Sequence, residues 1–196
     1  MAPELADGTR RVPALSLLRR WQRADEGTTA IEFAMVAMPF LLLLFGIMSV
    51  SLFYFANFSL ENAVWQAARA IRTGQMQQST GSYTGLVTLE EKRQAFKKVM
   101  CERAVTFPDC KTKAVVILQS NASFGGISEP SCTNQGTMVD QSSAPFDAGG
   151  ASAVVLVTVC YPWDFGGKLP FFKLGTLKDG SLLMQASAAF RTEPYN

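Results

Sequence analysis

The longest hydrophobic stretch of the chain starts close to its amino terminus and ends at Leu60. From Phe33 onward it contains no charged residue, and its middle section, Phe40–Gly46, is apolar throughout. A run of about 18 or more mostly apolar residues is typical of a transmembrane helix. The 28 uncharged residues from Phe33 to Leu60 therefore predict a single helix that crosses a bilayer with some tilt.

The helical pattern continues beyond this run. Apolar residues recur three, four and seven positions apart, with Glu and Arg mainly between them: Leu60, Ala63, Val64, Ala67, Ala68 and Ile71. Gly74 is a candidate helix terminator. We expect one helix from Thr28 to Thr73, roughly 70 Å long if continuous. Pro39 is a candidate kink, because an interior proline removes one backbone hydrogen bond.

A second, shorter helix is predicted after a polar loop at Gln75–Val87. Thr88 and Glu91 have the spacing of a capping box, which marks a helix start. This helix is expected to end near Arg103. Its expected buried side consists of Leu89, Phe96, Val99 and Met100.

Three later segments have the composition of strands: Lys113–Ser120, Ala151–Cys160 and Ser181–Thr192. Tyr161-Pro162-Trp163 is expected to end the second strand. Residues 121–150 are rich in Ser, Gly and Asn, which is typical of an exposed loop. The aromatic segment Asp164–Gly180, with Phe165, Phe171 and Phe172, is either a partner-binding or membrane-facing patch or the lid of a small core, and we favour the lid.

The chain is thus expected to have an α+β fold, with a long helix, a short helix and an antiparallel sheet of about three strands. We divide it into a cytoplasmic leader (1–27), a transmembrane helix (28–60), an amphipathic continuation (61–74) and a periplasmic domain (75–196).

Composition excludes several classes of function. The formal net charge is +2, with no basic stripe, so no nucleic-acid partner is expected. The sequence contains no histidine, which rules out Ser-His and Cys-His nucleophilic pairs and His-bearing metal sites. We expect no metal, no cofactor and no catalytic residue.

Four cysteines follow the hydrophobic run, at Cys101, Cys110, Cys132 and Cys160. An even number on one side of a membrane indicates disulfides in an oxidising compartment. Cys101 with Cys110, and Cys132 with Cys160, are the simplest pairs, although four cysteines permit three pairings. The spacings of 9, 22 and 28 residues do not fit the Cys-x-x-Cys pair of a thiol oxidoreductase.

The leader sets the expected orientation. It carries Arg10, Arg11, Arg19, Arg20 and Arg23, and such basic residues beside a membrane helix favour the cytoplasmic side. An ordinary cleaved secretory signal needs a shorter apolar core and a small-residue cleavage site, which this segment lacks. An uncleaved signal anchor remains an alternative.

Glu32 stands at the entrance of the hydrophobic run. An acid inside a membrane helix is disfavoured by roughly 2.5–3.5 kcal/mol at the bilayer centre, less near the interface, and is usually paired or functional. A cut after Gly27 would place a new ammonium group about one helical turn, roughly 6 Å, from Glu32. The two charges would then neutralise each other, within one chain or between adjacent chains. The alternative is an interfacial acid favoured only by the helix amino terminus.

These residues resemble the prepilin-peptidase site of the Flp/Tad branch of type IV pilins, which is a glycine, four small or apolar residues, then Glu-Phe or Glu-Tyr. The resemblance implies that Gly27 precedes the cut, Thr28 becomes the amino terminus, and Glu32 with Phe33 acts in assembly. Later segments are similar to TadE-like pseudopilins: Ala67-Ala68-Arg69, Arg72-Thr73-Gly74-Gln75, the pair Cys101 and Cys110, Tyr161-Pro162-Trp163, and Ala188–Pro194.

The resemblance implies a minor pilin of the inner membrane that is cut by a prepilin peptidase and then helps to assemble a pilus. Its partners would be the peptidase, other pilins or pseudopilins, inner-membrane assembly proteins and membrane lipid. The alternative is an unprocessed, signal-anchored periplasmic scaffold protein of an envelope secretion or adhesion machine. The length of the mature chain discriminates the two, because only the first loses 27 residues.

Overall fold

The computed structural model describes residues 27–165, 168 and 175–195. Residues 1–26 of the predicted leader, including its five arginines, lie outside the described residues. So do Phe171 and Phe172 of the aromatic segment. The chain divides into two compact units at Phe45 and Gly46. The predicted α+β class is confirmed.

The amino-terminal helix α2 (Thr28–Arg72) is 45 residues long and passes through Pro39. It ends where predicted. Gly74 adopts a positive φ of 76°. The N–H groups of Gly74 and Gln75 donate to the carbonyls of Ile71 and Ala70, at 3.1 and 2.9 Å, which is the Schellman pattern of helix termination.

A short 3-10 helix, η2 (Gly81–Tyr83), follows, and then α3 (Leu89–Arg103). The predicted capping box is present. The N–H of Glu91 donates to the Thr88 hydroxyl at 3.2 Å, and the Glu91 carboxylate accepts from the N–H of Thr88 at 2.9 Å. Phe96 and Met100 are fully buried, as expected. Leu89 was wrongly assigned to the buried side: it is 64% exposed, because the apolar stripe of α3 continues past the end of the core.

Thr88→Ala is expected to lower the free energy of unfolding by about 1 kcal/mol, since it removes the side-chain acceptor at the start of α3. Chemical denaturation of the detergent-solubilised protein measures this. Thr84→Ala is the matched control: its hydroxyl donates to the Gly81 carbonyl but caps no α-helix. Equal stability of the Thr88 variant and the wild type would contradict the prediction.

The sheet contains β1 (Val115–Asn121), β4 (Val154–Trp163) and β5 (Leu182–Arg191), in the order β1-β4-β5, and both pairings are antiparallel. The central strand β4 has the predicted length of 10 residues but begins and ends three residues later than predicted. Tyr161-Pro162-Trp163 continues this strand instead of ending it, with Trp163 opposite Leu182. Pro162 is tolerated because β1 stops pairing at Cys160, so this end of β4 has a partner on one side only.

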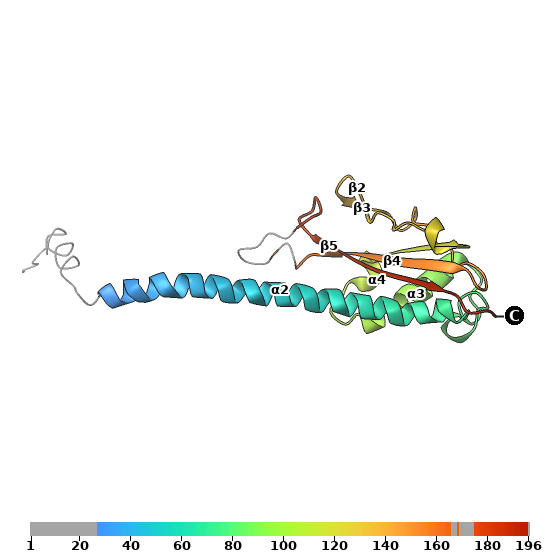
Figure 1. Ribbon diagram of the computed structural model, residues 1–196, viewed down its shortest axis with the longest axis horizontal. Helices are drawn as coiled ribbons and strands as arrows, with labels where there is room; N and C mark the ends of the chain where they lie inside the picture. The colour runs from blue at the N-terminus through green and yellow to red at the C-terminus, as the bar shows by residue number, and fades with distance from the viewer. Residues whose placement is uncertain (1–26, 166–167, 169–174, 196) are drawn as a thin grey trace, which may run out of the picture. The chain divides into compact units, whose positions relative to one another are not determined.

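The sheet has two covered faces. On one face, alternate strand residues pack with the predicted apolar stripe of α2, with Phe96 and with Met100. Figure 1 shows α2 and α3 along this face. All six predicted stripe residues, from Leu60 to Ile71, are buried. The other face carries a smaller cluster of Val115, Ile117, Cys132, Ala144 and Cys160.

Residues 121–150, predicted as an exposed loop, have more structure than expected. They contain the 3-10 helix η3 (Phe124–Gly126) and the two-residue strands β2 (Thr133–Asn134) and β3 (Thr137–Met138), which pair with each other. A bridge joins Phe146 to Leu118 of β1. This segment covers the second face of the sheet because Cys132 and Ala144 are buried against it.

Two disulfides stabilise these loops. Cys101 at the end of α3 pairs with Cys110, which begins the short helix α4 (Cys110–Lys113). The helix α4 was not predicted, since a single helical turn is too short for a periodic pattern. Cys132 pairs with Cys160 of β4. These are the two pairings that the sequence favoured.

Candidate functional site

The amino-terminal end of α2 carries the predicted cleavage and assembly residues. Gly27 is exposed, and Thr28 is the first residue of the helix. Glu32 follows one turn later and is exposed, and the side chain of Phe33 is 74% exposed. A Cβ atom built on Gly27 meets no atom within 4 Å, and its backbone does not require a glycine. Nothing within the described chain therefore explains why residue 27 has no side chain.

The hydrophobic run that follows is almost completely uncovered. α2 is long and apolar enough to cross a membrane, and only 6% of its most apolar window is buried. A core helix of a soluble protein would be mostly buried. The exposed apolar side chains include Met35, Val36, Phe40, Leu43 and Ile47. Length, composition and exposure together indicate a membrane anchor.

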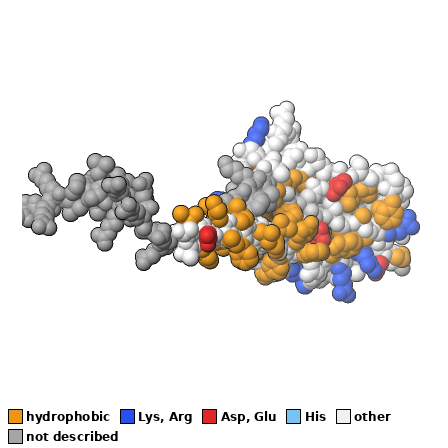
Figure 2. Space-filling model, turned by 60° about the vertical axis from the view of Figure 1, so that its left-hand side comes forward, with side chains coloured by type: hydrophobic (Ala, Val, Ile, Leu, Met, Phe, Trp, Pro, Cys, Tyr) orange, Lys and Arg blue, Asp and Glu red, His pale blue; other side chains and the backbone are white. Residues whose placement is uncertain are grey.

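Toward its carboxyl end, α2 becomes buried in the core of the domain. Its first fully buried large side chain is Leu60, preceded by the buried Ala56. Small residues at 56, 63, 67 and 68 let the helix approach the sheet closely. Figure 2 shows that hydrophobic side chains still occupy a broad area of the molecular surface, with acidic and basic groups scattered among them.

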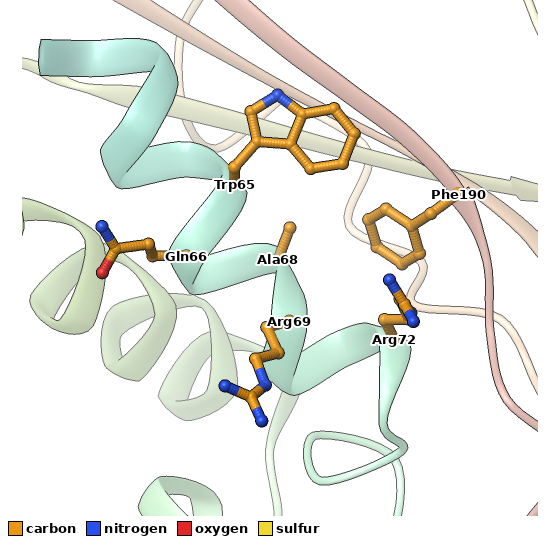
Figure 3. A pocket seen from close by; sticks show the side chains of 6 residues that line it. All are labelled: Trp65, Gln66, Ala68, Arg69, Arg72 and Phe190. Atoms are coloured by element: carbon orange, nitrogen blue, oxygen red, sulfur yellow. The ribbon is translucent and has the colours of Figure 1, made fainter.

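One part of this surface is a shallow pocket between α2 and β5. Trp65 and Phe190 project on either side of Ala68, and Arg72 lies beside the Phe190 ring (Figure 3). Trp65 is 53% exposed. Arg72 is held by Glu193, whose carboxylate lies 3.4 Å from its Nε. An exposed tryptophan beside arginine is the composition typical of protein–protein contacts.

A second pocket lies at the other end of the sheet. It is lined by Leu52, Phe55, Thr106, Pro108, Asp109, Tyr161, Trp163, Asp164 and Phe165. Aromatic rings connect its sides: the Trp163 ring centre is 6.4 Å from that of Phe53 and 5.6 Å from that of Phe165. The ring centres of Phe107 and Tyr161 lie 4.6 Å apart with the rings tilted by 57°, and burial raises the pKa of Tyr161.

The charges at the edge of this second pocket neutralise one another in part. The Lys113 ammonium forms ion pairs with Asp164 and with Asp109, the latter at 3.5 Å. The hydrogen bond to Asp164 is the main reason that the pKa of Lys113 lies above its ordinary value. In the described part of the chain, no three acidic or cysteine side chains gather in a way that would hold a metal ion.

Comparison with known protein families gives a match for most of α2. The family model described as TadE-like protein matches residues 27–69. This segment is TadE-like. The match begins at Gly27 and ends three residues before α2 ends, so it covers both the hydrophobic run and most of the buried stripe. No curated protein and no solved structure gave a significant match to the chain.

The expected resemblance to TadE-like proteins is therefore confirmed over residues 27–69. The similarity expected in later segments, such as Tyr161-Pro162-Trp163, lies outside the matched residues. The matched segment contains Gly27, Thr28, Glu32 and Phe33, which lie within seven consecutive residues of the chain. Sequence reasoning singled out Phe165 in its aromatic segment but missed the pocket around Trp163, because the pocket combines three segments that are far apart in the chain.

Proposed function

We propose that the chain is a minor pilin of a Flp/Tad-type pilus, made as a prepilin and cut between Gly27 and Thr28 by a prepilin peptidase. It is held in the bacterial inner membrane by residues 28–60, with the leader in the cytoplasm and residues 75–196 in the periplasm. Other pilins or pseudopilins and the inner-membrane assembly proteins are its partners. It has no enzymatic activity of its own.

The mechanism is physical. Before cleavage, the charged leader keeps the amino end of α2 on the cytoplasmic side of the bilayer. Cleavage removes this block and creates an ammonium group about one turn, roughly 6 Å, before Glu32. The hydrophobic half of α2 is then free to exchange lipid contacts for contacts with neighbouring pilin helices. Pairing of Glu32 with a neighbour's amino terminus sets the register of the assembled helices.

The observation that carries this proposal is the start of the family match at Gly27, one residue before α2 begins. Two further features support it. Gly27 is exposed and has open space around its Cα, so its small size serves something other than packing within this chain. The most apolar part of the helix after it is only 6% buried and so needs either lipid or partner helices around it.

The test is the amino-terminal sequence of the protein extracted from membranes of cells with and without their prepilin peptidase. A start at Thr28 only when the peptidase is present is the expected result. A start at the initiator end in both strains would contradict the proposal and favour the unprocessed, signal-anchored scaffold.

Gly27→Val is expected to abolish processing, because a peptidase that accepts only a glycine before the cut has no room for a branched side chain. The folded domain should be unaffected, since a Cβ at this position touches nothing. Gly150→Val is the matched control, because a Cβ there also meets no atom within 4 Å. Immunoblots of membrane fractions distinguish the longer precursor from the shorter product. Normal processing of Gly27→Val would remove the assigned role of Gly27.

A further inference from the structure

The aromatic pocket at the end of β4 lies at the level where α2 must leave the bilayer. A hydrocarbon core of about 30 Å is crossed by about 20 helical residues. Counted from Phe33, the first residue after the last amino-terminal charge, the part of the 28–60 segment that crosses the hydrocarbon core ends near Leu52, and residues 53–60 lie beyond it. Leu52 and Phe55 line the pocket, and the ring centre of Phe53 lies 6.4 Å from that of Trp163.

We propose that this pocket, together with the adjacent exposed Tyr54 of α2, is a membrane-contact surface, here called the basal surface and formed by Leu52, Tyr54, Phe55, Trp163 and Phe165. It rests in the interfacial layer of the bilayer, so the domain is fixed to the membrane by side chains of β4 as well as by α2. The proposal rests on insertion of α2 into the membrane.

Three observations favour lipid as the partner. Tyr54, Phe55 and Phe165 are more than half exposed, although they are large and aromatic. Aromatic side chains are enriched at the interface between hydrocarbon and water, where rings sit among the headgroups. The basal surface is also continuous with the hydrophobic run, since Leu52 and Tyr54 belong to the same uncharged stretch that ends at Leu60.

The charges beside the basal surface are compatible with this position. Lys113 is paired with Asp109 and Asp164, so three charged groups leave a net charge of −1. A surface of this charge gains nothing from acidic lipids. The contact is therefore apolar and is expected in vesicles of phosphatidylcholine alone.

The test uses single-tryptophan proteins in phosphatidylcholine vesicles that contain lipids brominated at shallow or deep acyl positions. Trp21, Trp65 and Trp163 are first replaced by phenylalanine. Three proteins are then made from this background, each with one tryptophan, at position 165, 45 or 65. Phe45 reports on insertion of α2. Residue 65 lies ten residues beyond Phe55, or about 15 Å along the helix, and reports on the part of the domain away from the membrane.

We expect shallow bromines to quench the fluorescence at residue 165, deep bromines to quench it at residue 45, and neither to quench it at residue 65. Quenching at 45 without quenching at 165 would overturn the basal surface while leaving the membrane anchor intact. No quenching at 45 would show that α2 does not insert, and both proposals would then fail. Shielding of residue 165 that depends on protein concentration and not on lipid would identify a second copy of the chain as the occupant.

The single-tryptophan proteins must be folded for this result to count. Their folding is checked by the formation of both disulfides and by a denaturation midpoint equal to that of the wild type. As a second readout, Phe165→Ser in a protein that keeps Trp163 as its one tryptophan is expected to expose Trp163 to a water-soluble quencher in vesicles. An unchanged accessibility of Trp163 would contradict the proposal without depending on the tryptophan placed at residue 165.

Discussion

Glu32→Gln is expected to leave cleavage after Gly27 intact and to strongly reduce incorporation of the mature chain into pili. Glutamine has nearly the same size as glutamate and keeps its hydrogen-bonding groups but not the negative charge. The ammonium group at Thr28 would then enter the helix bundle without a counter-charge. An uncompensated charge near the membrane interface costs about 2 kcal/mol, which corresponds to a roughly 30-fold weaker association.

The measurement is the fraction of cleaved protein that is recovered with sheared pili or cross-linked to other pilins. Glu61→Gln is the matched control. Glu61 is the first acid after the hydrophobic run and accepts a hydrogen bond from Asn57 at 2.9 Å, which glutamine can also accept. Normal incorporation of cleaved Glu32→Gln would show that Glu32 is an ordinary interfacial acid.

Replacing both Cys132 and Cys160 with alanine is expected to lower the free energy of unfolding of the periplasmic domain more than replacing the other cysteine pair does. The loop that this disulfide closes spans 28 residues, and the entropic model gives a loss of roughly 3.6 kcal/mol. Cys160 is fully buried in the central strand, and Cys132 is part of the small cluster on the second face of the sheet. The bridge therefore holds residues 121–150 against that face.

The paired replacement Cys101→Ala and Cys110→Ala is the comparison. Its nine-residue separation gives a smaller expected loss of roughly 2.7 kcal/mol. Double replacements avoid unpaired thiols that would form wrong disulfides. Denaturant titration of the detergent-solubilised protein, followed by near-ultraviolet circular dichroism, measures both. A larger loss for the Cys101 pair would contradict the assignment of Cys132–Cys160 as the main constraint.

Local signals predicted the helices well. The stripe of α2, its end at Gly74 and the capping box of α3 depend on residues within one or two turns, so the sequence contains all the information needed. The bounds of β4 did not follow from its own composition. Tyr161-Pro162-Trp163 looks like a strand end, but pairing with β5 extends the strand to Trp163 opposite Leu182.

The same distinction applies to the candidate sites. Gly27, Thr28, Glu32 and Phe33 form a motif of consecutive residues, which is readable without a structure. The basal surface depends on contact between Phe53 and Trp163, which no periodicity in the chain indicates. The exposure of Leu89 was also hidden, since an apolar repeat gives the buried side of a helix but not where the core beside it ends.

The continuity of α2 has a mechanical consequence. One helix supplies both the hydrophobic run and, through Leu60, Val64 and Ile71, buried side chains of the core that it shares with the sheet. A pull on the amino-terminal half is therefore carried by hydrogen bonds along the helix axis directly into the core, with no slack linker to absorb it. Tension that extracts such a helix from a bilayer would load the side-chain packing of the domain in shear.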